Sequence, residues 1–325
     1  MTSRLRDLIW VEDGRTGEER RLTRPAIYLL LATVVMVLGL NWPVMAKGIQ
    51  SITPIWMGVF RVTGGLAVAI TIGLASGNLA VPPRRDLPII GSLAVFRLTA
   101  VFVLVFTALQ LVPPGRSSVV VWTTSLWTVP IAAMFLGERM SGRRWVGLAL
   151  GISGVVVLFE PWGFDWAQPG VAVGHGLLIL AAIVNASTAV HIRGHRWTIT
   201  PLEAIPWQLM GAAIILVVLG LVFDGPPVID WTPQLVWIVI YQGILATGVA
   251  FWAQIVILRN LAAVSTNLTL MAVPVVGVAS SAILLGEVVT TTLAIGLLLV
   301  ILGVALNLLS DRGAPDELAE PTEVV

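Results

Sequence analysis

Apolar runs of about 20 residues recur along the chain, and each is long enough to cross the hydrocarbon core of a bilayer as a helix. The runs are continuous and lack a period of two, which disfavours a β-barrel. We therefore expect an all-α integral membrane protein. Its ten predicted transmembrane helices lie at residues 26–46, 54–76, 87–110, 117–136, 144–160, 171–192, 203–223, 233–257, 263–285 and 291–310.

Charge and cysteine content exclude several classes of protein. Only 11% of the residues are charged, against about 25% in a typical soluble domain. Cysteine is absent, which excludes disulfides, thiolate metal sites and thiol nucleophiles. Residues 1–24 and 311–325 are predicted to be solvated tails, and no cleavable signal peptide is expected. We expect the lipid bilayer and a small-molecule substrate as partners, and no nucleic acid.

The basic residues predict how the chain is oriented. With the amino terminus inside, fifteen Arg residues fall on the inner side, and only Lys47 and Arg116 fall on the outer side. The positive-inside rule then places both termini in the cytoplasm. We expect a multi-pass protein of a bacterial-type inner membrane.

The sequence repeats itself after 149 residues. This shift superimposes residues 136–138 on 285–287, both reading LGE, and also superimposes Gly147 on Gly296 and Gly154 on Gly303. Each copy holds five predicted helices, and an odd number inverts the second copy in the membrane. We expect two inverted five-helix repeats, residues 25–160 and 161–310, as is typical of secondary transporters. A duplicated scaffold without transport activity is the alternative.

The segments "VPIAAMFLGERMSGRRWVGLALGISGVVV" and "VPVVGVASSAILLGEVVTTTLAIGLLLVILGVAL" resemble the two halves of the EamA-type branch of the drug/metabolite transporter superfamily. The resemblance spans residues 26–310. It implies ten helices with both termini in the cytoplasm, and a central cavity lined by helices 1, 3, 4, 6, 8 and 9. It also implies export of amino acids, metabolites or drugs, without deciding among them.

Three prolines are predicted to bend helices or take part in gating. Pro43 interrupts the first predicted helix, and Pro274 stands thirteen residues before Glu287, where the family pattern has a proline. In the first half Ser125 occupies that position and the proline is Pro130. We therefore expect the bend of the fourth helix to be shifted by more than a turn.

Away from their ends, the predicted helices hold two arginines, Arg61 and Arg97, and no carboxylate. An arginine at the centre of a membrane helix costs roughly 2.5–3.5 kcal/mol. A substrate carboxylate or phosphate would make a charge-assisted hydrogen bond with such a group. The alternative is internal: backbone carbonyls freed near Pro43 or Pro130, or the side chain of Asn41, would satisfy Arg97.

Further substrate-binding candidates are polar or aromatic residues deep in predicted helices. They are Asn41, Trp42, Trp122, Ser125, Asn185, Tyr241, Trp252 and Asn267. The tryptophans could stack on a planar substrate. The alternative for each polar residue is a hydrogen bond between helices, worth about 0.6 kcal/mol on average.

Other residues of the repeat are assigned structural roles. Glu138 and Glu287 lie at helix ends, where each carboxylate can cap the helix that follows. Four glycines are predicted to serve close helix packing or a homodimer face: Gly147, Gly151, Gly296 and Gly303. His191 and His195 have the spacing of a metal pair but no third ligand in view, so we expect interfacial residues and no metal site.

No enzyme signature, catalytic residue or cofactor motif is present in the sequence. We therefore expect a secondary transporter that exports amino acids or other carboxylate-bearing metabolites by alternating access. A multidrug or quaternary-ammonium exporter of the same superfamily and a non-transporting sensor or scaffold are the alternatives. Proton relay through an intramembrane carboxylate is unavailable, which leaves facilitated diffusion or a weaker candidate, His175.

Overall fold

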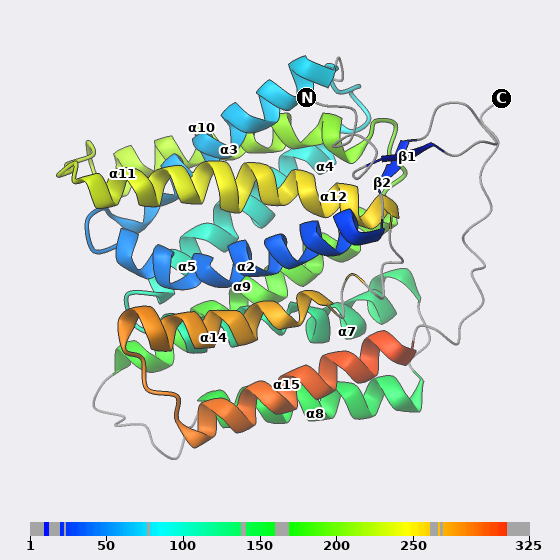
Figure 1. Ribbon diagram of the computed structural model, residues 1–325, viewed down its shortest axis with the longest axis vertical. Helices are drawn as coiled ribbons and strands as arrows, with labels where there is room; N and C mark the ends of the chain where they lie inside the picture. The colour runs from blue at the N-terminus through cyan, green and yellow to red at the C-terminus, as the bar shows by residue number, and fades with distance from the viewer. Residues whose placement is uncertain are drawn as a thin grey trace.

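The computed structural model describes residues 10–12, 20–22, 24–76, 79–137, 141–159, 169–260, 266 and 269–310. Its helices lie side by side in one bundle, and the helical chain begins and ends at the same end of that bundle (Figure 1). Seven stretches are long and apolar enough to cross a membrane, and two shorter apolar helices follow them. The prediction of a helical protein with several membrane-spanning segments is confirmed.

The helices follow the predicted runs closely. In chain order they are α2 (Arg24–Gly48), α3 (Pro54–Ser76), α4 (Leu87–Ser92), η1 (Leu93–Ala100), α5 (Val101–Ala108), α6 (Pro114–Trp122), α7 (Thr124–Leu136), α8 (Gly142–Phe159), α9 (Pro169–Gly194), α10 (Pro201–Phe223), α11 (Pro233–Ile240), η2 (Tyr241–Val249), α12 (Ala250–Asn260), α14 (Ala272–Leu285) and α15 (Thr291–Ser310). The tail before them contains a small hairpin that was not predicted, β1 (Trp10–Glu12) paired antiparallel with β2 (Arg20–Leu22).

Local sequence explains many of the helix ends. Proline opens several helices, including α3 and α6, because the first turn needs no backbone N–H. At α10 the Thr200 side chain accepts from the Glu203 N–H, and Glu203 caps in return. Gly137 and Gly286 follow α7 and α14 with φ of 70° and 68°, the left-handed conformation that glycine adopts without strain.

Interruptions occur at corresponding places in the two halves. The π-helix η1 (Leu93–Ala100), shifted by 149 residues, falls on 242–249, which is η2 without its first residue. The fourth span breaks at Thr123, and the same shift places that residue on Ala272, where α14 begins. Pro130 lies inside α7, after this break. The predicted shift of the helix bend toward Pro130 stays a prediction.

Helices α8 and α15 pack closely at one edge of the bundle (Figure 1). A Cβ on Gly303 would lie 2.5 Å from the Gly151 nitrogen and 2.6 Å from the Gly147 oxygen, so the backbones touch there. A Cβ on Gly296 would lie 2.5 Å from Leu158. The glycine face of α8 therefore packs against α15 within the chain. The homodimer stays a prediction.

The helix capped by Glu287 differs from the expected one. Its carboxylate accepts hydrogen bonds from the N–H groups of Gly115 at 2.8 Å and Arg116 at 3.3 Å, at the start of α6. The helix that follows, α15, is capped by Thr290 instead, which accepts from the Leu293 N–H at 3.1 Å. Glu287 thus connects the segment that follows α14 with the start of α6. Burial raises the pKa of Glu287, although the two N–H groups and Arg116 oppose this. Glu138 lies outside the described residues.

Candidate functional site

Arg61 on α3 is buried in a network of neutral side chains. Its Nη1 donates to Asn41 Oδ1 at 3.2 Å, to Met45 Sδ at 3.4 Å and to Gln242 Oε1. The guanidinium also lies over the Phe102 ring, with Cζ 4.8 Å from the ring centroid. Arg61 therefore connects α2, α3, α5 and η2, and amide dipoles and a ring face take the place of a carboxylate.

Three sequence-predicted residues meet at this network: Asn41, Arg61 and Tyr241. Asn41 Nδ2 donates to Met45 Sδ at 2.8 Å, and the Tyr241 hydroxyl donates to the Val37 carbonyl of α2 at 2.6 Å. Gln242 belongs to the same network and is fully buried beside Tyr241, but it was not among the predicted substrate-binding residues. A buried glutamine beside a tyrosine in an apolar run was the signal available for it.

Arg97 lies inside the π-helix η1 and has a different environment. Its side chain is half-buried, whereas Arg61 is 6% exposed. Among the described residues no group accepts a hydrogen bond from Arg97, and the structure does not bring Arg97 into the Arg61 network. Functional sites are frequent at π-helical segments. Arg97 is therefore an intramembrane cation that the described residues leave without a hydrogen-bond acceptor.

Two of the predicted tryptophans, Trp122 and Trp252, pack against the same apolar cluster. Trp122 and Trp252 pack against one buried apolar cluster of α2, α12 and α14, and Trp122 also contacts the larger cluster around α3 and α5. Trp42 is more deeply buried, and its Cδ1 would lie 3.3 Å from a Cβ on Gly277. It therefore packs against α14.

The remaining predicted side chains are dispersed. Ser125 on α7 and Asn185 on α9 are both half-buried. Pro43 and Pro274 lie inside α2 and α14, and both are buried. Asn267 lies outside the described residues.

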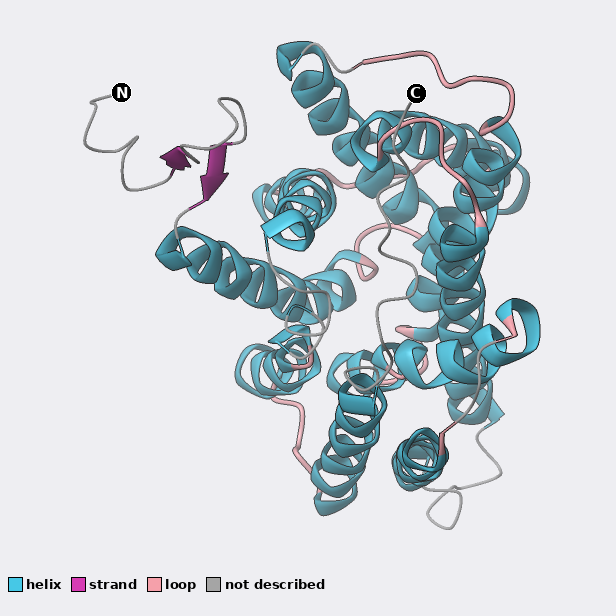
Figure 2. Ribbon diagram, turned by 90° about the vertical axis from the view of Figure 1, so that its right-hand side faces the viewer, coloured by secondary structure: helices cyan, strands magenta, loops and turns pink. Residues whose placement is uncertain are grey.

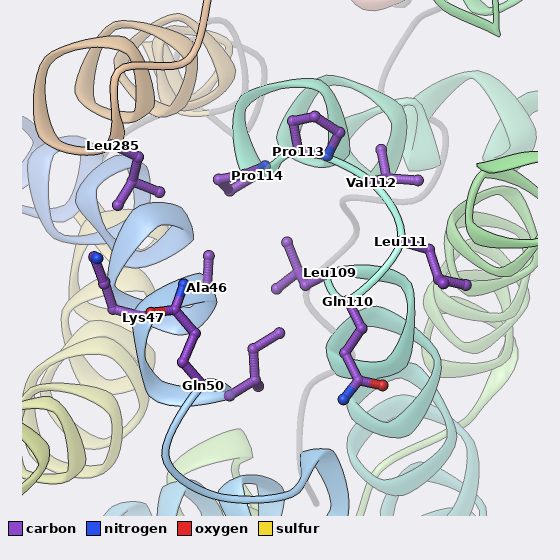
Figure 3. Close-up of a pocket in the computed structure, with 11 residues that line it drawn as sticks. Ala46, Lys47, Gln50, Leu109, Gln110, Leu111, Val112, Pro113, Pro114 and Leu285 are labelled. Atoms are coloured by element: carbon purple, nitrogen blue, oxygen red, sulfur yellow. The ribbon is translucent and has the colours of Figure 1, made fainter. Parts of the chain in front are cut away.

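A cavity of 490 Å³ lies at the end of the bundle that carries the α2–α3 and α14–α15 connections. The charge distribution predicts that this end faces outward, and we call it the predicted outer end. The cavity is formed where α2 and α14 end and where the chain passes from α5 into α6 (Figure 3). It lies beyond Met45 of the Arg61 network, because α2 continues from Met45 directly into the lining residues Ala46 and Lys47.

A buried carboxylate anchors the third span at the opposite end. Asp86 has no exposed surface, and it accepts from His195 Nε2 at 2.8 Å and from the Thr198 N–H at 3.1 Å and hydroxyl at 2.5 Å. Burial alone would raise the pKa of Asp86, but the bonds from Thr198 and His195 outweigh it and hold that pKa below its usual value. His195 thus serves the contact of this span with the α9–α10 connection. The described residues contain no group of three or more metal ligands.

The sequence profile described as the EamA-like transporter family matches residues 25–160 and again residues 172–309. The chain belongs to this family. Figure 2 looks onto the end of the bundle where the matched segments begin at α2 and finish at α15. EamA-like proteins are transporters of the drug/metabolite transporter superfamily and not enzymes, so the family resemblance is confirmed and a small-molecule substrate follows from it.

Curated relatives of this EamA-family chain carry transporter names. It is 25% identical over 282 residues to the uncharacterized transporter YoaV of Bacillus subtilis, covering 86% of this chain and 96% of that one. It is 26% identical over 295 residues to the "Probable amino-acid metabolite efflux pump" of Escherichia coli K12, covering 87% and 95%. A protein of known crystal structure shares the fold with a TM-score of 0.61 and 24% identity, over 89% of this chain and 99% of that one.

Proposed function

We propose that this EamA-family transporter exports amino acids or related carboxylate-bearing metabolites across a bacterial-type inner membrane. Both termini lie in the cytoplasm in this proposal, and the exporter works by alternating access between two inverted five-helix repeats. The observation that carries the substrate class is the intramembrane charge: away from their ends, the described helices hold Arg61 and Arg97 and no carboxylate.

Electrostatics favours an anionic or zwitterionic solute at Arg97. A cationic drug would face uncompensated repulsion in a medium of low dielectric constant, whereas a carboxylate would form a charge-assisted hydrogen bond. Arg61 already donates to Asn41 and Gln242, so the structure favours Arg97 as the receptor and Arg61 as a supporting group. Trp122 and Trp252 would bound the apolar part of the solute.

Paired backbone features support alternating access. The π-helices η1 and η2, and the left-handed Gly137 and Gly286, coincide under the 149-residue shift. Repeats of opposite orientation can exchange conformations and so open a central site first to one side and then to the other. The name of the Escherichia coli relative, which mentions amino-acid metabolites, agrees with the proposed direction and substrate class.

Efflux from proteoliposomes tests this function. Purified protein is reconstituted, the vesicles are loaded with labelled amino acids or with a labelled quaternary ammonium, and release is compared with protein-free vesicles. We expect saturable release of amino acids and none of the quaternary ammonium. Release of the quaternary ammonium alone would favour the multidrug alternative, and release of neither would favour a sensor or scaffold.

A further inference from the structure

The cavity at the predicted outer end combines a cation and two amides with apolar walls. Lys47 and Gln50 come from the end of α2 and the turn after it, and Gln110 follows α5 (Figure 3). Leu109, Pro113 and Leu285 contribute apolar surface to the same cavity. Its volume of 490 Å³ falls within the range of about 300–1,000 Å³ typical of small-molecule sites.

The polar groups of this cavity are free to bind a solute. Within the described residues, the side chains of Lys47, Gln50 and Gln110 form no hydrogen bond with the protein. The nearby acid is Glu287, and both of its oxygens already accept from the N–H groups that start α6. Lys47 is therefore the charged group that lines the cavity and has donors to offer.

We propose that this cavity is a second binding site for the exported solute, which it holds after the central site and before release. Lys47 receives the carboxylate, Gln50 and Gln110 offer amide hydrogen bonds, and the Leu and Pro side chains contact an apolar side chain of amino-acid size. The assignment of the solute rests on the proposed function, whereas the existence of a carboxylate site at Lys47 does not.

The position of the cavity fits a release site. Leu109 lies twelve residues after Arg97 along the third span, which is about 18 Å at 1.5 Å per residue. Arg97 and the cavity lined by Lys47 thus lie at different depths in the bundle, so we treat them as two separate sites. A solute that leaves Arg97 toward the predicted outer end would meet Lys47 next.

Equilibrium binding of tritiated L-phenylalanine to purified, full-length protein tests the proposal. Arg97→Leu is used as the background so that the central site does not contribute. We expect saturable binding that Lys47→Gln weakens about tenfold, the equivalent of 1.4 kcal/mol, and that Lys47→Arg restores. Phenethylamine, which lacks the carboxylate, is expected not to compete.

Arg116→Gln is the matched control, because it removes one positive charge at the same end from a residue that does not line the cavity. Equal weakening by Arg116→Gln and Lys47→Gln would overturn the proposal, since a general surface potential would then explain the binding. The proposal would also be overturned if Lys47→Gln left phenylalanine binding unchanged, or if no binding were found. Binding that depends on Lys47, without any flux by the wild-type protein, would support the cavity site and refute the export function. Flux without binding that depends on Lys47 would support the export function and refute the cavity site.

Discussion

Arg61 and Arg97 are both arginines inside an apolar helical bundle, yet the protein surrounds them differently. Arg61 is 6% exposed and shares one nitrogen among Asn41, Met45 and Gln242, with Phe102 against its face. Arg97 is half-buried in a π-helix and has no hydrogen-bond acceptor among the described residues. Neutral groups of the fold accept hydrogen bonds from Nη1 of Arg61, although its buried Nε has no partner among the described residues. In the proposed function, Arg97 is the cation that binds the solute. An intramembrane charge therefore indicates function only after its partners are known.

The largest loss of transport is expected from a substitution of Arg97. Arg97→Leu removes the receptor for the solute carboxylate, and a hydrogen bond to a charged group is worth about 1.5–3 kcal/mol. Amino-acid efflux from proteoliposomes should fall by roughly ten- to a hundredfold, while gel filtration and thermal melting remain those of the wild type. Loss of the folded, inserted protein in this variant would instead assign Arg97 an internal structural role.

For Gln242, which accepts a hydrogen bond from Arg61, we expect a loss of stability and little loss of transport. Gln242→Leu leaves the buried Arg61 charge with one acceptor fewer, and should lower the stability of the folded protein by about 1.5–3 kcal/mol. Thermal melting of the purified variant measures this loss, and the fraction that remains folded should still transport. Unchanged melting together with lost transport would show that Gln242 acts on the solute.

The anchor of the helix that carries Arg97 gives a pH-dependent prediction. The pKa of Asp86 is lowered in the folded protein, so its contribution is complete above the unfolded value near 3.9 and is lost as the pH falls through the folded pKa. Asp86→Asn should cost about 1–2 kcal/mol at pH 7. The difference in melting between variant and wild type should shrink below about pH 4. A difference that stays constant with pH would refute an ionised Asp86.

A substitution with a smaller expected effect on transport tests most directly whether Arg61, like Arg97, binds the solute. Gln242→Glu gives Arg61 a carboxylate of its own and should leave transport within about threefold of wild type. Gln242→Asn is the matched neutral control, which shortens the side chain without adding charge. If Arg61 binds the solute, the new glutamate competes with it, and Gln242→Glu will abolish transport.

Much of the fold was predictable because bilayer thickness and proline at helix starts act locally along the sequence. Helix α3, for example, has the predicted bounds of residues 54 and 76. The π-helices and the break at Thr123 were not predicted, since single-residue changes in helical winding leave the hydrophobic run unchanged. The hairpin of β1 and β2 was also missed in a charged segment.

The candidate site was less predictable because its partners come from distant parts of the chain. Asn41, Arg61 and Tyr241 could be selected as polar residues inside apolar runs, but their meeting with Gln242 depends on how helices pack. The Glu287 contact is similar: its role as a helix cap could be predicted, but not that α6, 171 residues earlier at Arg116, would supply the N–H groups. The buried state of Asp86 was hidden by its position beside the exposed Arg84 and Arg85.

The central claim is that Arg97 receives the carboxylate of the solute. Its most direct test is counterflow of labelled L-phenylalanine in proteoliposomes, with unlabelled phenylalanine and phenethylamine as competitors, in wild type and in Arg97→Gln. We predict that phenylalanine competes far better than phenethylamine in the wild type, and that Arg97→Gln removes this preference. Equal competition by the two compounds in the wild type, or an unchanged preference in Arg97→Gln, would contradict the account.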